Sequence, residues 1–520
     1  MASSDPAGVD PARTDPAGTD EAVLARPGLG PVLAGSLVFG TSAAVLVLEV
    51  LSLRLLAPYL GLTLETSTTV IGIALSAIAC GAWAGGRAAD RTDPAGAVGP
   101  LVLAGGALYL LVVPVVRWAG DAVRGTPDAG AVLLVAALAV FAPAALLSAV
   151  SPMVVKARLG TLDETGAVVG RLSGLGTLGA IVGTFVTGFV LVAAFPTSGV
   201  VLVVGSLLVA AGIVLTVRAR SGARSRGRLA GPAAVAVVAA AGTALAPSGC
   251  EIETAYHCAR VATDPGRPSG RTLVLDTLRH SYVDLEDPQH LEFMYVRAMA
   301  SALDAVAPAP RPVDALFLGG GGFTLPRFLA ASRPGSRSLV HEIDPAVVAL
   351  ARERLGLRTG PADGVEARVG DARLGLFEAA PASRDVIVGD AFGQISVPWH
   401  LTTREVAQQV RRVLRPGGVY LLNVIDHAPL AFARAEVATI ADVFGSVAVL
   451  ATPDALAGRG GGNLVVVAST AALPVDAIRA ALARRALPLG VAGGDGARAF
   501  AAAAGVLTDD HAPVDQLLTP

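Results

Sequence analysis

Between residues 31 and 246, long apolar runs alternate with short polar loops. Each run is about the length that a helix needs to cross a bilayer core of roughly 30 Å. The runs cover residues 31–53, 66–86, 98–116, 131–150, 176–195, 199–217 and 229–246. The last is the weakest, because it is mostly Ala and Val. The pattern predicts a membrane domain of about seven transmembrane helices over residues 29–248.

The segments that flank these runs differ in character. Residues 1–28 repeat an Asp-Pro-Ala theme and contain almost no large apolar side chains. They are predicted to form a disordered tail, because they cannot bury enough surface to offset the entropy of ordering. Cys250 and Cys258 stand directly after the last run. They suit a small disulfide loop in an oxidising compartment, or two free thiols at a cytoplasmic membrane surface.

Basic residues favour one side of the predicted helices. Loops on the cytoplasmic side of a membrane carry an excess of Lys and Arg. Only Arg54, Arg117 and Arg124 fall on the side opposite the N-terminus. On its own side stand Arg13, Arg26, Arg87, Arg91, Lys156, Arg158, Arg171, Arg218, Arg220, Arg224, Arg226 and Arg228. The N-terminus is therefore predicted to be cytoplasmic, and seven spans would put the rest of the chain outside.

A different pattern follows residue 250. Short strand-like runs alternate with helical patterns, which predicts a mostly parallel sheet with helices on both faces, a Rossmann-like α/β fold. Residues 249–312 form a small β subdomain and a proline-rich linker in this interpretation, and residues 313–520 form the α/β domain. The predicted strands lie at 315–318, 338–342, 365–369, 385–388, 419–424, 447–450 and 464–468. The predicted helices lie at 324–331, 346–355 and 403–413.

Composition agrees with a chain that is partly in lipid. Of 520 residues, 53% are hydrophobic, and the mean hydropathy is +0.61, both higher than in an ordinary soluble chain. The lipid bilayer is therefore a predicted partner. The net charge of −2 and the scarcity of basic clusters argue against a nucleic-acid partner.

Three acids follow three predicted strands. Glu342, Asp371 and Asp390 each come directly after a strand, and the glycine run 319–322 follows the strand at 315–318. In an open α/β sheet, ligands bind at the carboxyl ends of the strands, so these groups are predicted to form one nucleotide site. Any single acid could instead be a helix N-cap or a solvated loop residue.

The spacing of these motifs resembles a known family. The motifs LFLGGGG, HEIDP, VGDAR, DVIVGDAF and LRPGG are similar to those of the spermidine synthases, aminopropyltransferases with the class I methyltransferase fold. The resemblance covers about residues 251–520. The preceding helices resemble the membrane region of bacterial chains that fuse a transporter-like part to a spermidine synthase.

The resemblance implies roles for individual residues. Decarboxylated S-adenosylmethionine, or S-adenosylmethionine, would be the co-substrate, with Glu342 on its ribose hydroxyls and Asp371 on its adenine. Asp390 would be the base that deprotonates the attacking amine. The remaining implied site residues are Gly319, Gly320 and Gly321 around the nucleoside, and His280 and Tyr295 in the amine pocket. No metal is implied, and a homodimer is common in the family.

Several positions depart from the family pattern. Gly322 stands in place of an aspartate, Arg297 in place of an acid, and no second aspartate follows Asp390. Each lost carboxylate removes a charge-assisted hydrogen bond of about 1.5 to 3 kcal/mol to a cationic diamine. A methyltransferase, or a non-catalytic ligand-sensing module attached to a transporter-like domain, are therefore alternatives to an aminopropyltransferase. Supply of a cytoplasmic co-substrate favours an inward domain, so the side of this domain in the cell membrane stays open.

Overall fold

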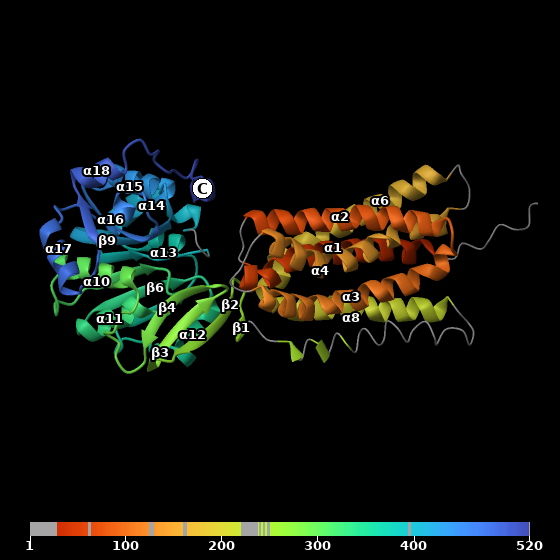
Figure 1. Ribbon diagram of the computed structural model, residues 1–520, viewed down its shortest axis with the longest axis horizontal. Helices are drawn as coiled ribbons and strands as arrows, with labels where there is room; N and C mark the ends of the chain where they lie inside the picture. The colour runs from red at the N-terminus through yellow and green to blue at the C-terminus, as the bar shows by residue number, and fades with distance from the viewer. Residues whose placement is uncertain are drawn as a thin grey trace, which may run out of the picture.

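The computed structural model describes residues 29–60, 64–123, 129–159, 164–219, 250–393 and 397–518, together with five isolated positions between 238 and 246. A helical bundle lies at one end of the molecule's long axis and an α/β part at the other (Figure 1). The predicted tail and most of the seventh apolar run lie outside the described residues.

The first six predicted apolar runs are confirmed as helices long and apolar enough to cross a membrane. These candidate spans are Pro31–Leu60, Thr66–Ala89, Pro94–Ala122, Gly130–Arg158, Thr165–Ala194 and Thr197–Arg218. The helices themselves are α1 (Pro31–Leu60), α2 (Leu64–Ala89), α3 (Pro94–Ala122), α4 (Ala129–Ser148), α5 (Val150–Arg158), α6 (Thr165–Val186), η1 (Thr187–Leu191), α7 (Val192–Ala194) and α8 (Thr197–Arg218).

Glycines let the helices of the bundle approach closely. A Cβ added at Gly81 would lie 2.1 Å from the carbonyl oxygen of Ala145, and one at Gly179 would lie 2.2 Å from that of Phe39. Helix α2 therefore packs backbone against backbone on α4, and α6 packs in the same way on α1. Small residues at such contacts are typical of helices that associate in lipid.

The β subdomain lies between the bundle and the α/β domain. Its four antiparallel strands are β1 (Ile252–Glu253), β2 (Cys258–Asp264), β3 (Arg267–Leu275) and β4 (Leu278–Asp284), in the order β1-β2-β3-β4. A disulfide joins Cys250 to Cys258, so the first of the two alternatives for this pair is realised. Helix α10 (Met294–Val306) then leads into the larger sheet.

The α/β domain is built on an eight-stranded sheet of order β12-β10-β11-β9-β8-β5-β6-β7. Its strands are β5 (Asp314–Leu318), β6 (Arg337–Glu342), β7 (Val365–Val369), β8 (Arg384–Gly389), β9 (Leu414–Asp426), β10 (Ser446–Ala451), β11 (Gly462–Ser469) and β12 (Gly490–Gly493). Its helices are α11 (Thr324–Ser332), α12 (Pro345–Arg354), α13 (Ala372–Glu378), α14 (Arg404–Val413), α15 (Ala431–Val443), α16 (Pro453–Leu456), α17 (Val475–Arg484), α18 (Asp495–Phe500) and α19 (Val514–Leu518), with a 3-10 turn η2 (Trp399–Leu401).

The expectation of a mostly parallel sheet is correct only for the part from β9 to β7. Strand β11 pairs antiparallel with both β9 and β10, and β10 pairs antiparallel with β12. The cause is the short connection from β10 to β11, which carries only the four-residue helix α16. Parallel neighbours need a longer crossover, usually through a full helix.

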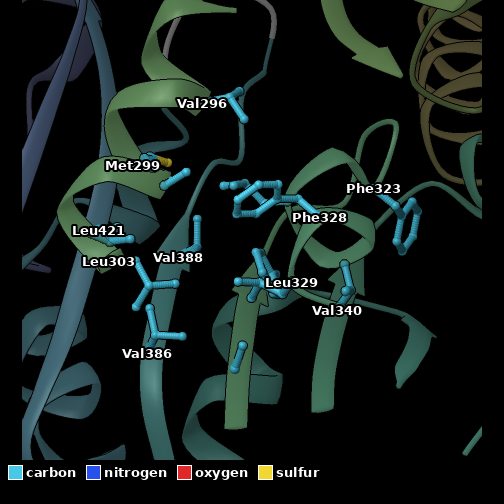
Figure 2. Packing of buried hydrophobic residues seen from close by; sticks show 14 of the residues in the cluster. Val296, Met299, Leu303, Phe323, Phe328, Leu329, Val340, Val386, Val388 and Leu421 are labelled. Carbon is cyan, nitrogen blue, oxygen red and sulfur yellow. The ribbon is translucent and has the colours of Figure 1, made fainter. Parts of the chain in front are cut away.

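Helices cover both faces of this sheet, as predicted. On one face, Val296, Met299 and Leu303 of α10 and Phe328 and Leu329 of α11 point at the sheet (Figure 2). They pack against side chains of three central strands, namely Val340, Val386, Val388 and Leu421. Helices α14 and α15 bury their apolar sides against the other face. This core fixes the strand ends that form the candidate site.

The bundle contacts the β subdomain through polar groups at one end. Arg54 of α1 donates hydrogen bonds to the carbonyls of Ala255 and Thr254, the latter at 3.0 Å. Glu253 of β1 accepts hydrogen bonds from the backbone N–H and hydroxyl of Ser198, at 2.9 and 3.0 Å. The ends of α1 and α8 near these residues therefore contact the β subdomain.

Candidate active site

The carboxyl ends of four strands lie side by side, as the sequence predicts. Asp390 donates its backbone N–H to Leu318 of β5 at 2.9 Å, and Gly319 donates its own to His341 of β6 at 3.0 Å. Gly370, at the end of β7, donates to the carbonyl of Glu342 at 2.9 Å. These contacts bring the glycine turn and all three predicted acids to one edge of the sheet.

The turn after β5 needs glycine. Gly319 and Gly321 have φ values of 102° and 49°, a backbone region that glycine adopts without strain. A Cβ at Gly319 would also lie 2.3 Å from the carbonyl oxygen of Asp390. The turn is thus held tightly against the residue that ends β8.

Glu342 is buried behind this turn. Its Oε2 accepts the backbone N–H groups of Gly320 and Gly321 at 2.9 and 3.0 Å, and its Oε1 accepts that of Asp344 at 3.0 Å. A carboxylate offers about four acceptor positions, so one remains for a ligand hydroxyl. The arrangement fits a sugar hydroxyl bound at the glycine turn.

Asp371 caps a helix with one carboxylate oxygen and leaves the other partly exposed. Its Oδ1 accepts the backbone N–H of Arg373 at 2.7 Å and caps α13, so the helix-cap alternative is realised. Its Oδ2 lies 3.9 Å from Nε2 of His400 and is partly exposed. The neighbouring Leu374 and Trp399 are 65% and 51% exposed, which offers apolar surface for a flat base beside a free carboxylate oxygen.

The disulfide loop comes close to the same edge. Tyr256, between Cys250 and Cys258, is 46% exposed. Burial, followed by the charges of Asp344, Asp371 and Glu342, raises the pKa of the Tyr256 phenol. No sequence pattern points to this tyrosine, because only the fold brings the loop to the carboxyl ends of β6 and β7.

Asp390 is held at the bottom of a cleft by two donors. The phenol of Tyr295 donates to Oδ2 at 3.1 Å, and the side-chain amide of Asn423 donates to Oδ1 at 2.9 Å. Burial raises the pKa of Asp390 to about 6, and the two hydrogen bonds oppose this rise. A carboxylate of this pKa is ionised at neutral pH yet can accept a proton, as a general base must.

Asn423 and Asn463 were not among the predicted site residues. Nδ2 of Asn463 on β11 donates to Oδ1 of Asn423 on β9 at 3.0 Å, which turns the Asn423 amide nitrogen toward Asp390. The only sequence signal is a single amide within each of the apolar strands YLLNVI and GNLVVVA. Its meaning depends on the pairing of β9 with β11.

A cleft of about 380 Å³ opens above Asp390. His280, Tyr295, Gly320 and Gly321 line it together with Asp390, whereas Gly319, Glu342 and Asp371 lie outside its lining. Burial, followed by the charge of His257, lowers the pKa of His280 to about 4, so this imidazole is neutral at physiological pH. The remaining lining residues are Leu278, Arg279, Ser281, Phe293, Met294, Phe392, Asn423, Ile425 and Asn463.

The structure gives physical reasons for two departures from the family pattern. Gly322 donates its N–H to the hydroxyl of Ser281 at 2.9 Å, and a Cβ there would lie 2.7 Å from Cβ of Ser281. An aspartate at 322 would therefore collide with β4. Arg297 points away from the cleft and donates to the carbonyl of Arg485, beyond α17.

Comparisons with known proteins concern this part of the chain. No family model matches the chain. The polyamine aminopropyltransferase of Vibrio vulnificus is 30% identical over 195 residues, which are 37% of this chain and 61% of that protein. That of Chromobacterium violaceum is 33% identical over 148 residues, 28% of this chain and 53% of that protein. The chain thus spans between half and two thirds of these curated relatives.

A solved structure is similar over a longer stretch. The crystal structure of a probable spermidine synthase from Corynebacterium glutamicum has 32% sequence identity, with 50% of this chain and 95% of that chain covered and a TM-score of 0.46. The C-terminal half of the chain is thus similar to polyamine aminopropyltransferases and to a probable spermidine synthase.

Proposed function

We propose that the chain is a membrane-embedded aminopropyltransferase that moves the aminopropyl group of decarboxylated S-adenosylmethionine to an amine. The observation that carries this proposal is the Asp390 carboxylate, which has a raised pKa and lies on the same cleft as Gly320 and Gly321. Similarity to polyamine aminopropyltransferases supports the reaction class. The donor-site acids and the base are consistent with a nucleoside on one side of the cleft and an amine on the other.

The chemistry needs a free amine. The acceptor nitrogen attacks the aminopropyl carbon next to the sulfonium sulfur, the C–N bond forms, and the C–S bond breaks with its electron pair going to sulfur. The nucleoside leaves as a neutral thioether, methylthioadenosine. Asp390 accepts the proton that the amine nitrogen gives up and later releases it to water. Asn423 and Tyr295 stabilise the ionised carboxylate before it acts.

The donor half of the site would use groups at the strand ends. Glu342 has one acceptor position left for a ribose hydroxyl. Asp371 has a partly exposed Oδ2 for the amino group of adenine.

The bundle is proposed to lie in the cell membrane, with the β subdomain and the α/β domain (together the enzyme domain) on the non-cytoplasmic side. Arg54 and Arg117 lie at the end that contacts β1. At the other end, Lys156 pairs with Asp90 at 3.1 Å, and Arg158 donates to the carbonyl of Leu29. The basic residues Arg87, Arg91 and Arg218 lie at or just beyond the ends of α2 and α8 on this same side. Basic residues mark the cytoplasmic side, and the disulfide suits an oxidising compartment on the opposite side.

The function can be tested on the purified full-length chain in detergent, independently of sidedness. The chain is incubated with decarboxylated S-adenosylmethionine and a set of primary amines, and formation of methylthioadenosine and of the aminopropylated amine is followed by mass spectrometry. A parallel incubation with S-adenosylmethionine detects methyl transfer. Transfer of methyl alone, or no binding of any of these nucleosides by calorimetry, would reject the proposal. If an Asp390→Asn chain kept full turnover, Asp390 would not be the base.

A further inference from the structure

We infer that the acceptor of this cleft is a small primary amine with a single positive charge and an apolar remainder, and not a dicationic diamine. The inference rests on the proposed function and concerns the same site. It follows from the charges on the cleft wall, from what fills the places of the missing acids, and from the apolar surface beside Asp390.

The cleft wall can neutralise only one ammonium group. Asp390 is the sole carboxylate among the described residues that line it. The wall also carries a cation, Arg279, whose guanidinium carbon lies 5.3 Å from the ring centroid of Phe293. His280 is neutral, and Asn423 and Asn463 contribute amides. A second ammonium would enter without a counter-charge and close to a like charge.

Two positions that carry an acid in the family pattern, 322 and 297, cannot supply a negative charge to the cleft. Ser281 fills the space that a side chain at position 322 would need. Arg297 is held by the carbonyl of Arg485 and does not reach the cleft. At positions 322 and 297, the packing of β4 and α10 therefore keeps a second anion off the cleft wall.

The rest of the wall is apolar. Phe293, Met294, Phe392, Ile425 and Leu278 line the cleft together with the polar groups around Asp390. An alkyl or aryl group gains free energy on such a surface, whereas a charged group without a partner loses its hydration there. One amine would thus meet Asp390 while the remainder of the molecule contacts these side chains.

The test compares two acceptors of nearly equal shape on the purified full-length chain with decarboxylated S-adenosylmethionine. In n-pentylamine a methyl group replaces the second ammonium of 1,4-diaminobutane. We expect kcat/KM for n-pentylamine to exceed that for 1,4-diaminobutane at least tenfold. Equal or better use of the diamine overturns the inference and leaves the proposed function intact. Refusal of every amine, with donor binding retained in calorimetry, makes the proposed function itself fail.

A charge added to the wall gives a second, independent readout. Met294 is 37% exposed at the cleft, so a polar side chain of similar length placed there can keep contact with water. Met294→Glu should raise the ratio of diamine to monoamine kcat/KM about tenfold, whereas the matched Met294→Gln should leave it near the wild-type value. If Met294→Glu and Met294→Gln give the same ratio, a missing counter-charge does not determine acceptor choice and the inference is wrong.

Discussion

The side-chain amide of Asn423 donates a 2.9 Å hydrogen bond to Oδ1 of Asp390. Two opposing effects therefore set the pKa of this carboxyl. Burial raises it, and the hydrogen bonds from Asn423 and Tyr295 lower it, with a net value of about 6. Asn423 thus both orients the proposed base and helps to set the pH at which that carboxyl is ionised.

Replacing Asn423 should move the pH dependence of turnover. The acidic limb of kcat/KM should lie near pH 6 in the wild type, because Asp390 must be ionised to accept a proton. Asn423→Leu removes a hydrogen bond to the charged form, so the limb should shift by about 1 pH unit to higher pH. The measurement is kcat/KM between pH 5 and 9.

Asn463 provides the matched control for this shift. It contacts Asn423 and orients the Asn423 amide. Asn463→Ala should therefore shift the limb in the same direction but by less, since Asn423 can still donate when its amide is free to rotate. An acidic limb that stays in place in the Asn423→Leu chain would show that another group determines the profile.

Removing the charge of Asp390 should lower turnover and raise stability at neutral pH. Asp390→Asn is expected to reduce kcat about 10² to 10⁴-fold, as is typical for loss of a general base. The pKa of Asp390 is raised from 3.8 to about 6 in the folded state, so the folded state binds this proton more tightly than the unfolded state does. The wild type therefore loses stability as the pH rises from about 4 through 6.

The size of this stability effect follows from the shift. A raised pKa of about 2 units corresponds to about 3 kcal/mol, so Asp390→Asn should be more stable than the wild type by up to this amount at pH 8. The difference should nearly vanish at about pH 3, where the carboxyl is mostly neutral in both states. Denaturant unfolding of the full-length chain in detergent at the two pH values measures it, and an equal difference at both would contradict the assignment of the shift to Asp390.

Glu342 should determine the affinity for the nucleoside. Glu342→Gln replaces one acceptor oxygen by an NH₂ group that would face the N–H groups of the glycine turn or of Asp344. Loss of a charge-assisted hydrogen bond is worth about 1.5 to 3 kcal/mol, so Kd for methylthioadenosine should rise about 10- to 100-fold in calorimetry. Asp371→Asn is the milder control, because Asn also caps helices. A Glu342→Gln chain that binds as tightly as the wild type would exclude this role.

The gathering of the three acids at one edge of the sheet could be predicted because it depends on local order. Glu342, Asp371 and Asp390 each follow a strand with a clear apolar pattern, and parallel strands necessarily align their carboxyl ends at one edge. The glycine run between β5 and α11 predicts the turn for the same reason. No knowledge of which strands are neighbours was needed.

The acceptor half depends on pairing between distant segments. Asn423 contacts Asn463 only because β11 inserts antiparallel beside β9, with Asn423 opposite Val465 and Asn463 opposite Ile425. Ser281 reaches Gly322 only because β4 of the small subdomain lies over the glycine turn. Such contacts follow from tertiary packing, for which the periodicity of a single strand contains no information.

The proposed orientation makes a prediction about the cysteines. Cys250 and Cys258 form a disulfide and line a pocket together with Arg54 and Arg117, at the end of the bundle that contacts β1. In intact cells that carry a Cys80→Ala chain, a membrane-impermeant maleimide should label this pair only after treatment with a membrane-impermeant reductant, because the pair is oxidised and lies outside. Cys80 is removed because it is the free, exposed cysteine of α2.

A cysteine at the opposite end of the bundle completes the test. Arg218 ends α8, about 33 Å from the start of that 22-residue helix at 1.5 Å per residue. In the Cys80→Ala background, Arg218→Cys should stay unlabelled in intact cells and become labelled after the cells are permeabilised. The reverse pattern, with Arg218→Cys labelled from outside and the pair protected, would place the enzyme domain in the cytoplasm. The basic end of the bundle would then face outward, against the charge rule on which the orientation rests.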